Sequence, residues 1–190
     1  MSDVVLHGRV VLPKPPERLL LDWQREVTDN LQLQPGDVEV LPLARARTRW
    51  PNFRQWVQAA ADWTHSLGLN TLLSRSDMAL MACRGAAPHH DGEQYAAYAF
   101  CNLFVSEDRG LDLHFASTGL RIPLVRGTVV IFDTCQPHEV LVREQGGYAA
   151  SDFPDGIDLT QVFLTWELPI DDPQLAPLLN IQFETSRTTD

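Results

Sequence analysis

Positive charge is scarce in this sequence. Lys14 is the only lysine, and 15 lysines and arginines stand against 25 aspartates and glutamates, for a formal net charge of -10. We therefore expect no nucleic acid as a partner, because its phosphates would be repelled. The one basic cluster consists of Arg45, Arg47 and Arg49. Arginines at alternate positions are typical of a solvated strand or loop.

Cysteines and long apolar runs are also few. Cys83, Cys101 and Cys135 are widely spaced and form no CxxC pair, which predicts reduced thiols in a cytoplasmic protein and disfavours a cysteine-based zinc site. The longest apolar runs, such as VVIF, are far shorter than the roughly 20 residues that cross a bilayer. The N-terminal segment has an early Asp3 and no long apolar stretch, so we expect no signal peptide and no membrane partner.

The length of 190 residues, with 44% hydrophobic and 21% charged residues, predicts one globular domain over 1–190. Apolar residues recur every three or four positions in 17–32 and again in 52–67, which predicts two amphipathic helices. The segment VEVLPLARA predicts a short strand. We expect residues 1–76 to form a helical support region and residues 77–170 a barrel core.

The spacing of apolar residues changes after residue 77. Short apolar or alternating segments follow one another, and Gly, Pro, Asp and Ser separate them about every ten residues. This rhythm indicates a mainly β structure, either a sandwich or a barrel.

The segment PHHDG contains the residues with the clearest chemistry. On an extended strand His89 and Asp91 project to one face and His90 to the other. Two imidazoles and one carboxylate on one face of an octahedron are the ligand set of non-haem iron(II). The second histidine must come from another strand, and both His138 and His114 are candidates. We favour His138, because a glycine turn, an apolar strand and a short polar loop place it at a strand end, and we expect His114 to face outward.

From about Met78 to Trp166 the sequence resembles the iron(II)/2-oxoglutarate-dependent dioxygenase superfamily, chiefly its prolyl-hydroxylase-like branch, with a partial likeness to the DNA-repair demethylases. The segments that carry the resemblance, in the family's order, are MALMACRGAAPHHDGEQY, YAAYAFCNLFVSED, RGLDLHF, GTVVIFDTCQPHEV and LTQVFLTWEL. The resemblance implies a double-stranded β-helix (a jelly-roll, cupin-like barrel) with flanking helices. It also implies iron(II) on His89, Asp91 and His138, 2-oxoglutarate as co-substrate, and oxidation of a C–H bond by dioxygen. Zinc would compete for the same ligands.

The resemblance further implies a cation near Thr160 or Gln161 that pairs with the distal carboxylate of 2-oxoglutarate, and neither position is basic. Arg143 is our candidate for this role. Other arginines that could take it are Arg84, Arg121 and Arg126. A buried dicarboxylate without a cation would be costly.

Further candidates lie near the triad. Tyr98 and Asn102, on the strand after PHHDG, are candidate donors to a co-substrate carboxylate, as is Tyr95. Asp133 could orient His138 or cap a loop.

Two other functions stay open. The protein could be an iron oxygenase whose substrate itself chelates the metal, without 2-oxoglutarate, or a barrel that binds a partner without catalysis. A small molecule is the preferred substrate, and an amino-acid or peptide side chain is the alternative. The sequence predicts no oligomeric state.

Overall fold

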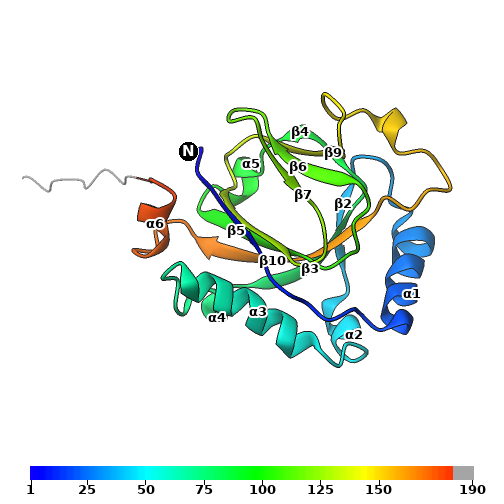
Figure 1. The fold of residues 1–190 in the computed structure, drawn as a ribbon, viewed down its shortest axis with the longest axis horizontal. Helices are drawn as coiled ribbons and strands as arrows, with labels where there is room; N and C mark the ends of the chain where they lie inside the picture. Colours follow the sequence, from blue (N-terminus) through cyan, green and yellow to red (C-terminus); the bar gives the residue numbers. More distant parts are fainter. Residues whose placement is uncertain (182–190) are drawn as a thin grey trace, which may run out of the picture.

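The structure is a computed structural model that describes residues 1–181. It consists of two antiparallel sheets that pack face to face, with helices α1 to α4 on the outer side of the larger sheet (Figure 1). That residues 1–190 form one domain stays a prediction, and its last part, 182–190, lies outside the described residues. No helix within 1–181 has the length and apolar character needed to cross a membrane.

The larger sheet has six strands in the order β1-β8-β5-β10-β3-β2 and the smaller has four in the order β4-β9-β6-β7. The strands of the larger sheet are β1 (Val5–Arg9), β2 (Val38–Leu41), β3 (Met78–Cys83), β5 (Tyr98–Phe104), β8 (Thr128–Asp133) and β10 (Gln161–Pro169). Those of the smaller sheet are β4 (Ala86–His89), β6 (Leu111–Phe115), β7 (Leu120–Pro123) and β9 (His138–Val142).

Strands β3 to β10 pair as one long hairpin wound into two sheets. The pairs are β3 with β10, β4 with β9, β5 with β8 and β6 with β7, all antiparallel. This nested pairing is the double-stranded β-helix or jelly roll, so the predicted fold class is confirmed. Strands β1 and β2, from the first 76 residues, extend the two edges of the larger sheet.

The helical segments lie mostly before β3 and after β10. Their bounds are α1 (Glu17–Arg25), η1 (Glu26–Leu31), α2 (Leu43–Arg47), α3 (Phe53–Ser66), α4 (Leu72–Arg75), α5 (Gly92–Tyr95), η2 (Ala150–Asp152) and α6 (Leu175–Leu178). Helix α3 confirms the helix predicted over 52–67, and α1 with η1 confirms the one over 17–32.

The segment η1 is a π-helix that continues α1 without a break. Its cause is visible in the spacing of Leu19, Trp23, Val27 and Leu31, which recur every fourth residue. On an α-helix of 3.6 residues per turn such a stripe drifts around the axis by about 40° at each step. The wider π turn reverses this drift, and Val27 and Leu31 stay packed against the core.

One prediction in this region was wrong. The segment VEVLPLARA forms a strand only to Leu41, and α2 begins after Pro42. Proline at a helix start fixes φ and loses no helical hydrogen bond, so the chain turns from strand to helix there. Arg45 therefore lies on a helix, where it pairs with Glu26, and is not on a solvated strand.

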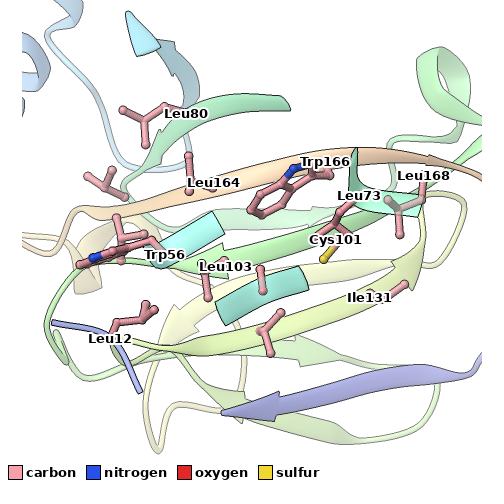
Figure 2. Packing of buried hydrophobic residues seen from close by; sticks show 14 of the residues in the cluster. Leu12, Trp56, Leu73, Leu80, Cys101, Leu103, Ile131, Leu164, Trp166 and Leu168 are labelled. Atoms are coloured by element: carbon pink, nitrogen blue, oxygen red, sulfur yellow. The ribbon is translucent and has the colours of Figure 1, made fainter. Parts of the chain in front are cut away.

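The larger sheet is covered on both faces. Its outer face packs against the helices in an apolar group that we call the helix-side core, which includes Trp56, Leu80, Cys101, Leu103, Leu164 and Trp166 (Figure 2). Its inner face meets the smaller sheet in a second group, the inter-sheet core, which includes Phe104, Phe115, Val130, Phe132 and Phe163. Successive side chains of each strand point alternately into the helix-side core and the inter-sheet core.

Candidate metal centre

The three residues of the predicted triad converge at one end of the inter-sheet space. His89 ends β4 and His138 begins β9, and the two are direct partners across the antiparallel pair. Asp91 follows two residues after His89, and its backbone N–H donates to the Thr134 carbonyl oxygen at 2.8 Å. Potential ligand atoms of the three side chains all lie within 4.8 Å of one another. One metal ion can therefore reach all three.

Both imidazoles present the same nitrogen. The His89 Nδ1 lies 2.7 Å from the Ala87 carbonyl oxygen, and the His138 Nδ1 lies 2.9 Å from that of Gln136. A carbonyl oxygen only accepts, so each Nδ1 carries the hydrogen and each Nε2 has a free lone pair. These Nε2 atoms lie 3.8 Å (His89) and 3.6 Å (His138) from the two carboxylate oxygens of Asp91.

The electrostatic state of the site suits a cation. Burial, assisted by the neighbouring His89, lowers the pKa of His138 to about 4, so its imidazole is neutral at pH 7 and can coordinate. Burial raises the pKa of Asp91 above its usual range. The carboxylate therefore lacks a fixed counter-ion sufficient to offset the loss of hydration, and a bound metal would supply one.

The loop after Asp91 is held against the loop between β8 and β9. The Thr134 hydroxyl lies 2.7 Å from the Tyr95 carbonyl oxygen and 2.9 Å from that of Tyr98, and can donate its one hydrogen to either. A Cβ on Gly92 would lie 2.7 Å from the Cys135 sulfur and 3.3 Å from the Cys135 Cα. Glycine at position 92 thus allows the close approach that brings Asp91 to the histidines.

The inter-sheet space opens toward this end. Along β10 the inward-facing side chains pass from Gln161, which has no exposed surface, to Thr165 at 8%, and then to the half-buried Glu167. Along β5 they pass from Phe104 at 2% to Asn102 at 8% and the half-buried Phe100 and Tyr98. The metal end of both strands is therefore the more exposed end.

Arg143 lies away from the metal end. It follows β9 five residues after His138, about 16 Å along an extended strand, and on the opposite face. Its Nε donates to Asp112 at 2.9 Å, and its Nη1 and Nη2 donate to the two Asp108 oxygens at 3.1 and 2.9 Å. The structure therefore does not bring Arg143 to the triad, and its donors already face two carboxylates.

The alternative arginines are held elsewhere too. Arg84 donates to the carbonyl oxygens of Phe153 and Pro154, each at 2.9 Å. Arg126 pairs with Glu107 at 2.6 Å. Arg121 lies on β7 opposite His114, on the outer face of the smaller sheet.

His114 and Asp133 have structural partners. The His114 Nδ1 lies 2.7 Å from Glu139 Oε1 on the outer face, as expected. Asp133 Oδ1 accepts from the Cys135 N–H at 2.8 Å, and Oδ2 accepts from the Ser2 N–H at 2.7 Å. Asp133 thus caps a loop, and the Gln136 carbonyl orients His138 instead.

Tyr98 and Asn102 both face the inter-sheet space on β5. Thr165, which sequence reasoning missed, lies beside Asn102 as its direct partner on β10. Its signal was the alternation of FLTWE, in which Phe163 and Thr165 share one face and Leu164 and Trp166 the other.

A separate cavity of about 470 Å³ lies between α1, η1 and the loop before β10. Trp23, Arg84 and Ile157 are among its lining residues, and no member of the triad is. This cavity lies nearer the closed end of the barrel, where β10 begins.

Comparisons with known proteins give structural likenesses only. No family model and no curated protein sequence matches the chain. A prolyl-4-hydroxylase from Pseudomonas putida is 16% identical, with 86% of this chain and 91% of that chain covered and a TM-score of 0.47. The viral collagen prolyl hydroxylase of Paramecium bursaria Chlorella virus-1 is 9% identical, with 86% and 93% covered and a TM-score of 0.47. A non-haem α-ketoglutarate-dependent epimerase from nogalamycin biosynthesis is 9% identical, with 86% and 77% covered and a TM-score of 0.44.

Proposed function

We propose that this protein is a non-haem iron(II) dioxygenase that oxidises a C–H bond of a small-molecule, amino-acid or peptide substrate. The supporting observation is the arrangement of His89, Asp91 and His138, whose ligand atoms lie within 4.8 Å of one another. Two imidazoles and one carboxylate, from one strand pair and its adjoining loop, leave the remaining coordination positions of a six-coordinate ion to exchangeable ligands.

Iron(II) fits these donors, and His89, Asp91 and His138 would hold it. Bound there, it would activate dioxygen, so that one oxygen atom enters the substrate C–H bond and the other enters the carboxylate formed as a 2-oxo acid loses carbon dioxide. The chain's own part is to fix both Nε2 lone pairs toward the ion by the Ala87 and Gln136 carbonyls. The apolar walls, which include Phe100 and Phe132, exclude water from the reacting end.

The three ligands account for the binding of only one half of a 2-oxo acid, the half that chelates the metal. The far half of 2-oxoglutarate carries a second carboxylate, which needs a cation when it is buried. Within 1–181 the arginine proposed for it, Arg143, is engaged by Asp108 and Asp112. We therefore assign the co-substrate here only as a 2-oxo acid.

The proposed partners are dioxygen and a small molecule or peptide. A net charge of -10 disfavours a nucleic acid, and three free thiols favour the reducing cytoplasm.

The test is iron loading under argon, followed by oxygen uptake. Protein purified without oxygen should bind one equivalent of Fe(II) and, with a 2-oxo acid, consume dioxygen. Asp91→Ala should abolish both. The matched control is His65→Ala, which removes an exposed imidazole on α3, away from the triad, and should keep both. Absence of stoichiometric iron, or full oxygen uptake by Asp91→Ala, would refute the proposal.

A further inference from the structure

We propose that the cavity of about 470 Å³ between α1, η1 and the loop before β10 binds a small molecule that has one carboxylate and an apolar body. The volume lies within the roughly 300–1,000 Å³ that is usual for small-molecule sites in proteins. No member of the metal-binding triad lines the cavity. The proposed site is therefore a second one, and it does not depend on the iron chemistry.

Apolar side chains form both walls of the cavity. Leu20, Trp23 and Val27 line it on the side of α1 and η1, and Ile157 and Val162 line it on the other side. Trp23 and Val162 are each 5% exposed, whereas Ile157 is 55% exposed, so this lining runs from the buried part of the cavity to solvent. A ligand with an apolar body would cover it and remove it from water.

Arg84, which follows β3, is the cation that the cavity offers to a ligand. Its side chain lines the cavity and is 13% exposed. Its Nη2 donates to the carbonyl oxygens of Phe153 and Pro154, each at 2.9 Å. Its Nε and Nη1 make no hydrogen bond within residues 1–181, and both atoms keep some accessible surface. A carboxylate can therefore accept a charge-assisted hydrogen bond from either nitrogen.

Thr160, one residue before β10, adds a hydroxyl to the cavity. The residue is 9% exposed, and its Oγ1 makes no hydrogen bond within the described residues yet keeps some accessible surface. The hydroxyl of Ser106, which also lines the cavity, already accepts from the Val162 N–H at 2.6 Å. Among the lining residues that are not exposed, Arg84 and Thr160 are thus the two whose polar side-chain atoms are free and within reach of solvent. Both can donate to an anion.

The carboxylates around the cavity are already paired or lie in water. Glu107 and Asp158 each pair with an arginine, at 2.6 and 2.9 Å. Asp155 Oδ1 lies 3.7 Å from Arg84 Nη2, but the Asp155 side chain is fully exposed, so solvent weakens this pair. A ligand carboxylate inside the cavity would be a nearer partner for Arg84. The net charge of -10 opposes any anion, which favours a ligand with a single carboxylate.

Two unusual backbone features meet at this cavity. The π-helix η1 contributes Val27 and Thr28 to the lining, and π-helical turns occur frequently at functional sites. Gln32, which ends η1 and also lines the cavity, has a left-handed φ of 50°, which is uncommon for a residue other than glycine. Sparsely populated backbone conformations of this kind cluster at ligand sites, which supports a binding role for this part of the fold.

Three probes with the same alkyl chain separate charge from shape: octanoate, octanol and octylammonium. Each is titrated by calorimetry into the full chain, below the concentration at which the probe associates with itself. We expect one equivalent of octanoate to bind at least about tenfold more tightly than octanol, and octylammonium to bind more weakly than either. The affinity for octanoate should be the same with and without a metal chelator, because the site is not the metal centre.

Two variants locate the site. Ile157→Asp, at an exposed position, should weaken octanoate binding at least about tenfold, because it removes apolar surface and adds a like charge. Arg84→Gln should reduce the preference for octanoate over octanol to less than about threefold and leave the affinity for octanol unchanged. The matched control is Arg121→Gln, which removes an arginine from β7, outside the cavity, and should leave both affinities unchanged.

Four results would overturn the proposal. Binding of octanol or octylammonium as tightly as octanoate would exclude selection of a carboxylate. Absence of saturable binding of any probe would exclude the site itself. An equal loss of octanoate and octanol binding in Arg84→Gln would show that Arg84 only holds the loop that contains Phe153 and Pro154. Unchanged octanoate binding in Ile157→Asp would show that the probe binds elsewhere. Iron loading is measured independently, so each of these results leaves the proposed function standing.

Discussion

The two faces of the larger sheet have opposite characters, although the same strands build both. On the helix side, Leu164 and Trp166 are buried among apolar neighbours. On the inner side, Thr165 is 8% exposed and lies beside Asn102, whose side-chain oxygen has no hydrogen-bond partner within residues 1–181. The helix-side core is almost entirely apolar, although the indole N–H groups of Trp23, Trp50 and Trp56 are buried there without a partner among the described residues. What distinguishes the inner face is the triad, whose potential ligand atoms lie within 4.8 Å of one another, as expected of a surface that binds something.

Removal of the triad carboxylate should produce the largest effect on the inner face. Asp91→Ala should weaken Fe(II) or Zn(II) binding at least about a thousandfold, equivalent to about 4 kcal/mol. The melting temperature of the metal-free variant should not fall, because burial already disfavours the charged Asp91. Calorimetry of metal binding and thermal melting measure the two quantities. A variant that keeps the affinity would show that the carboxylate is not a ligand.

Adjacent residues of β10 offer a matched pair across the sheet. Leu164→Ala should reduce the free energy of unfolding by about 3 kcal/mol, because it opens a cavity in the helix-side core. Thr165→Val should change it by less than about 1 kcal/mol, since it adds no cavity. Urea denaturation of the two variants measures both. Equal losses would mean that the inner face contributes to stability as much as the outer one.

The Gly92 contact tests how closely the site loop must approach. Gly92→Ala places a methyl group 2.7 Å from the Cys135 sulfur and should weaken metal binding about tenfold, as expected when the support of a ligand shifts. Cys135→Ala in the same chain should restore part of the affinity. Gly146→Ala is the control, because a Cβ there meets nothing within 4 Å. Equal affinity in Gly92→Ala and the wild type would contradict the close contact.

The smallest effect concerns Asp108, outside both faces. Hydrogen bonds from Arg143 hold the pKa of Asp108 below its ordinary value of 3.8. The depressed pKa means that the ion pair stabilises the fold above about pH 4 and is lost as the pH falls through the folded-state value. Asp108→Asn should therefore lower the melting temperature by a degree or two at pH 7. The difference should vanish near pH 2, and a difference that persists there would exclude this origin.

The fold was predictable because its strands are short and are separated by turn-forming residues such as Gly, Pro, Asp and Ser. The resemblance of the ordered segments from Met78 to Trp166 implied the jelly roll, and apolar residues at spacings of three and four predicted the first helix. The π-helical end was not predicted, because helix type depends on which side chains the core accepts. The error at Pro42 has a similar origin, since LARA suits a strand or a helix by pattern alone and the preceding proline decided it.

The triad was more predictable than the co-substrate residues. His89 and Asp91 share a face by strand parity, and the strand order brings His138 opposite. Arg143 was the arginine we preferred for the co-substrate carboxylate, although its odd spacing from His138 points it outward on a regular strand, and the structure places it outward. The same alternation could have shown that Thr165 faces inward. That it lies beside Asn102 could not be predicted, because strand register is a property of the folded chain.

The pairing of His89 with His138 has a consequence for the whole chain. A metal held by both histidines ties together positions 49 residues apart (138 − 89), and so closes a loop that an unfolded chain would have to close at an entropic cost. Such a metal would act as a reversible cross-link between β4 and β9. Metal binding would therefore stabilise the folded chain, and the melting temperature should rise with the metal concentration.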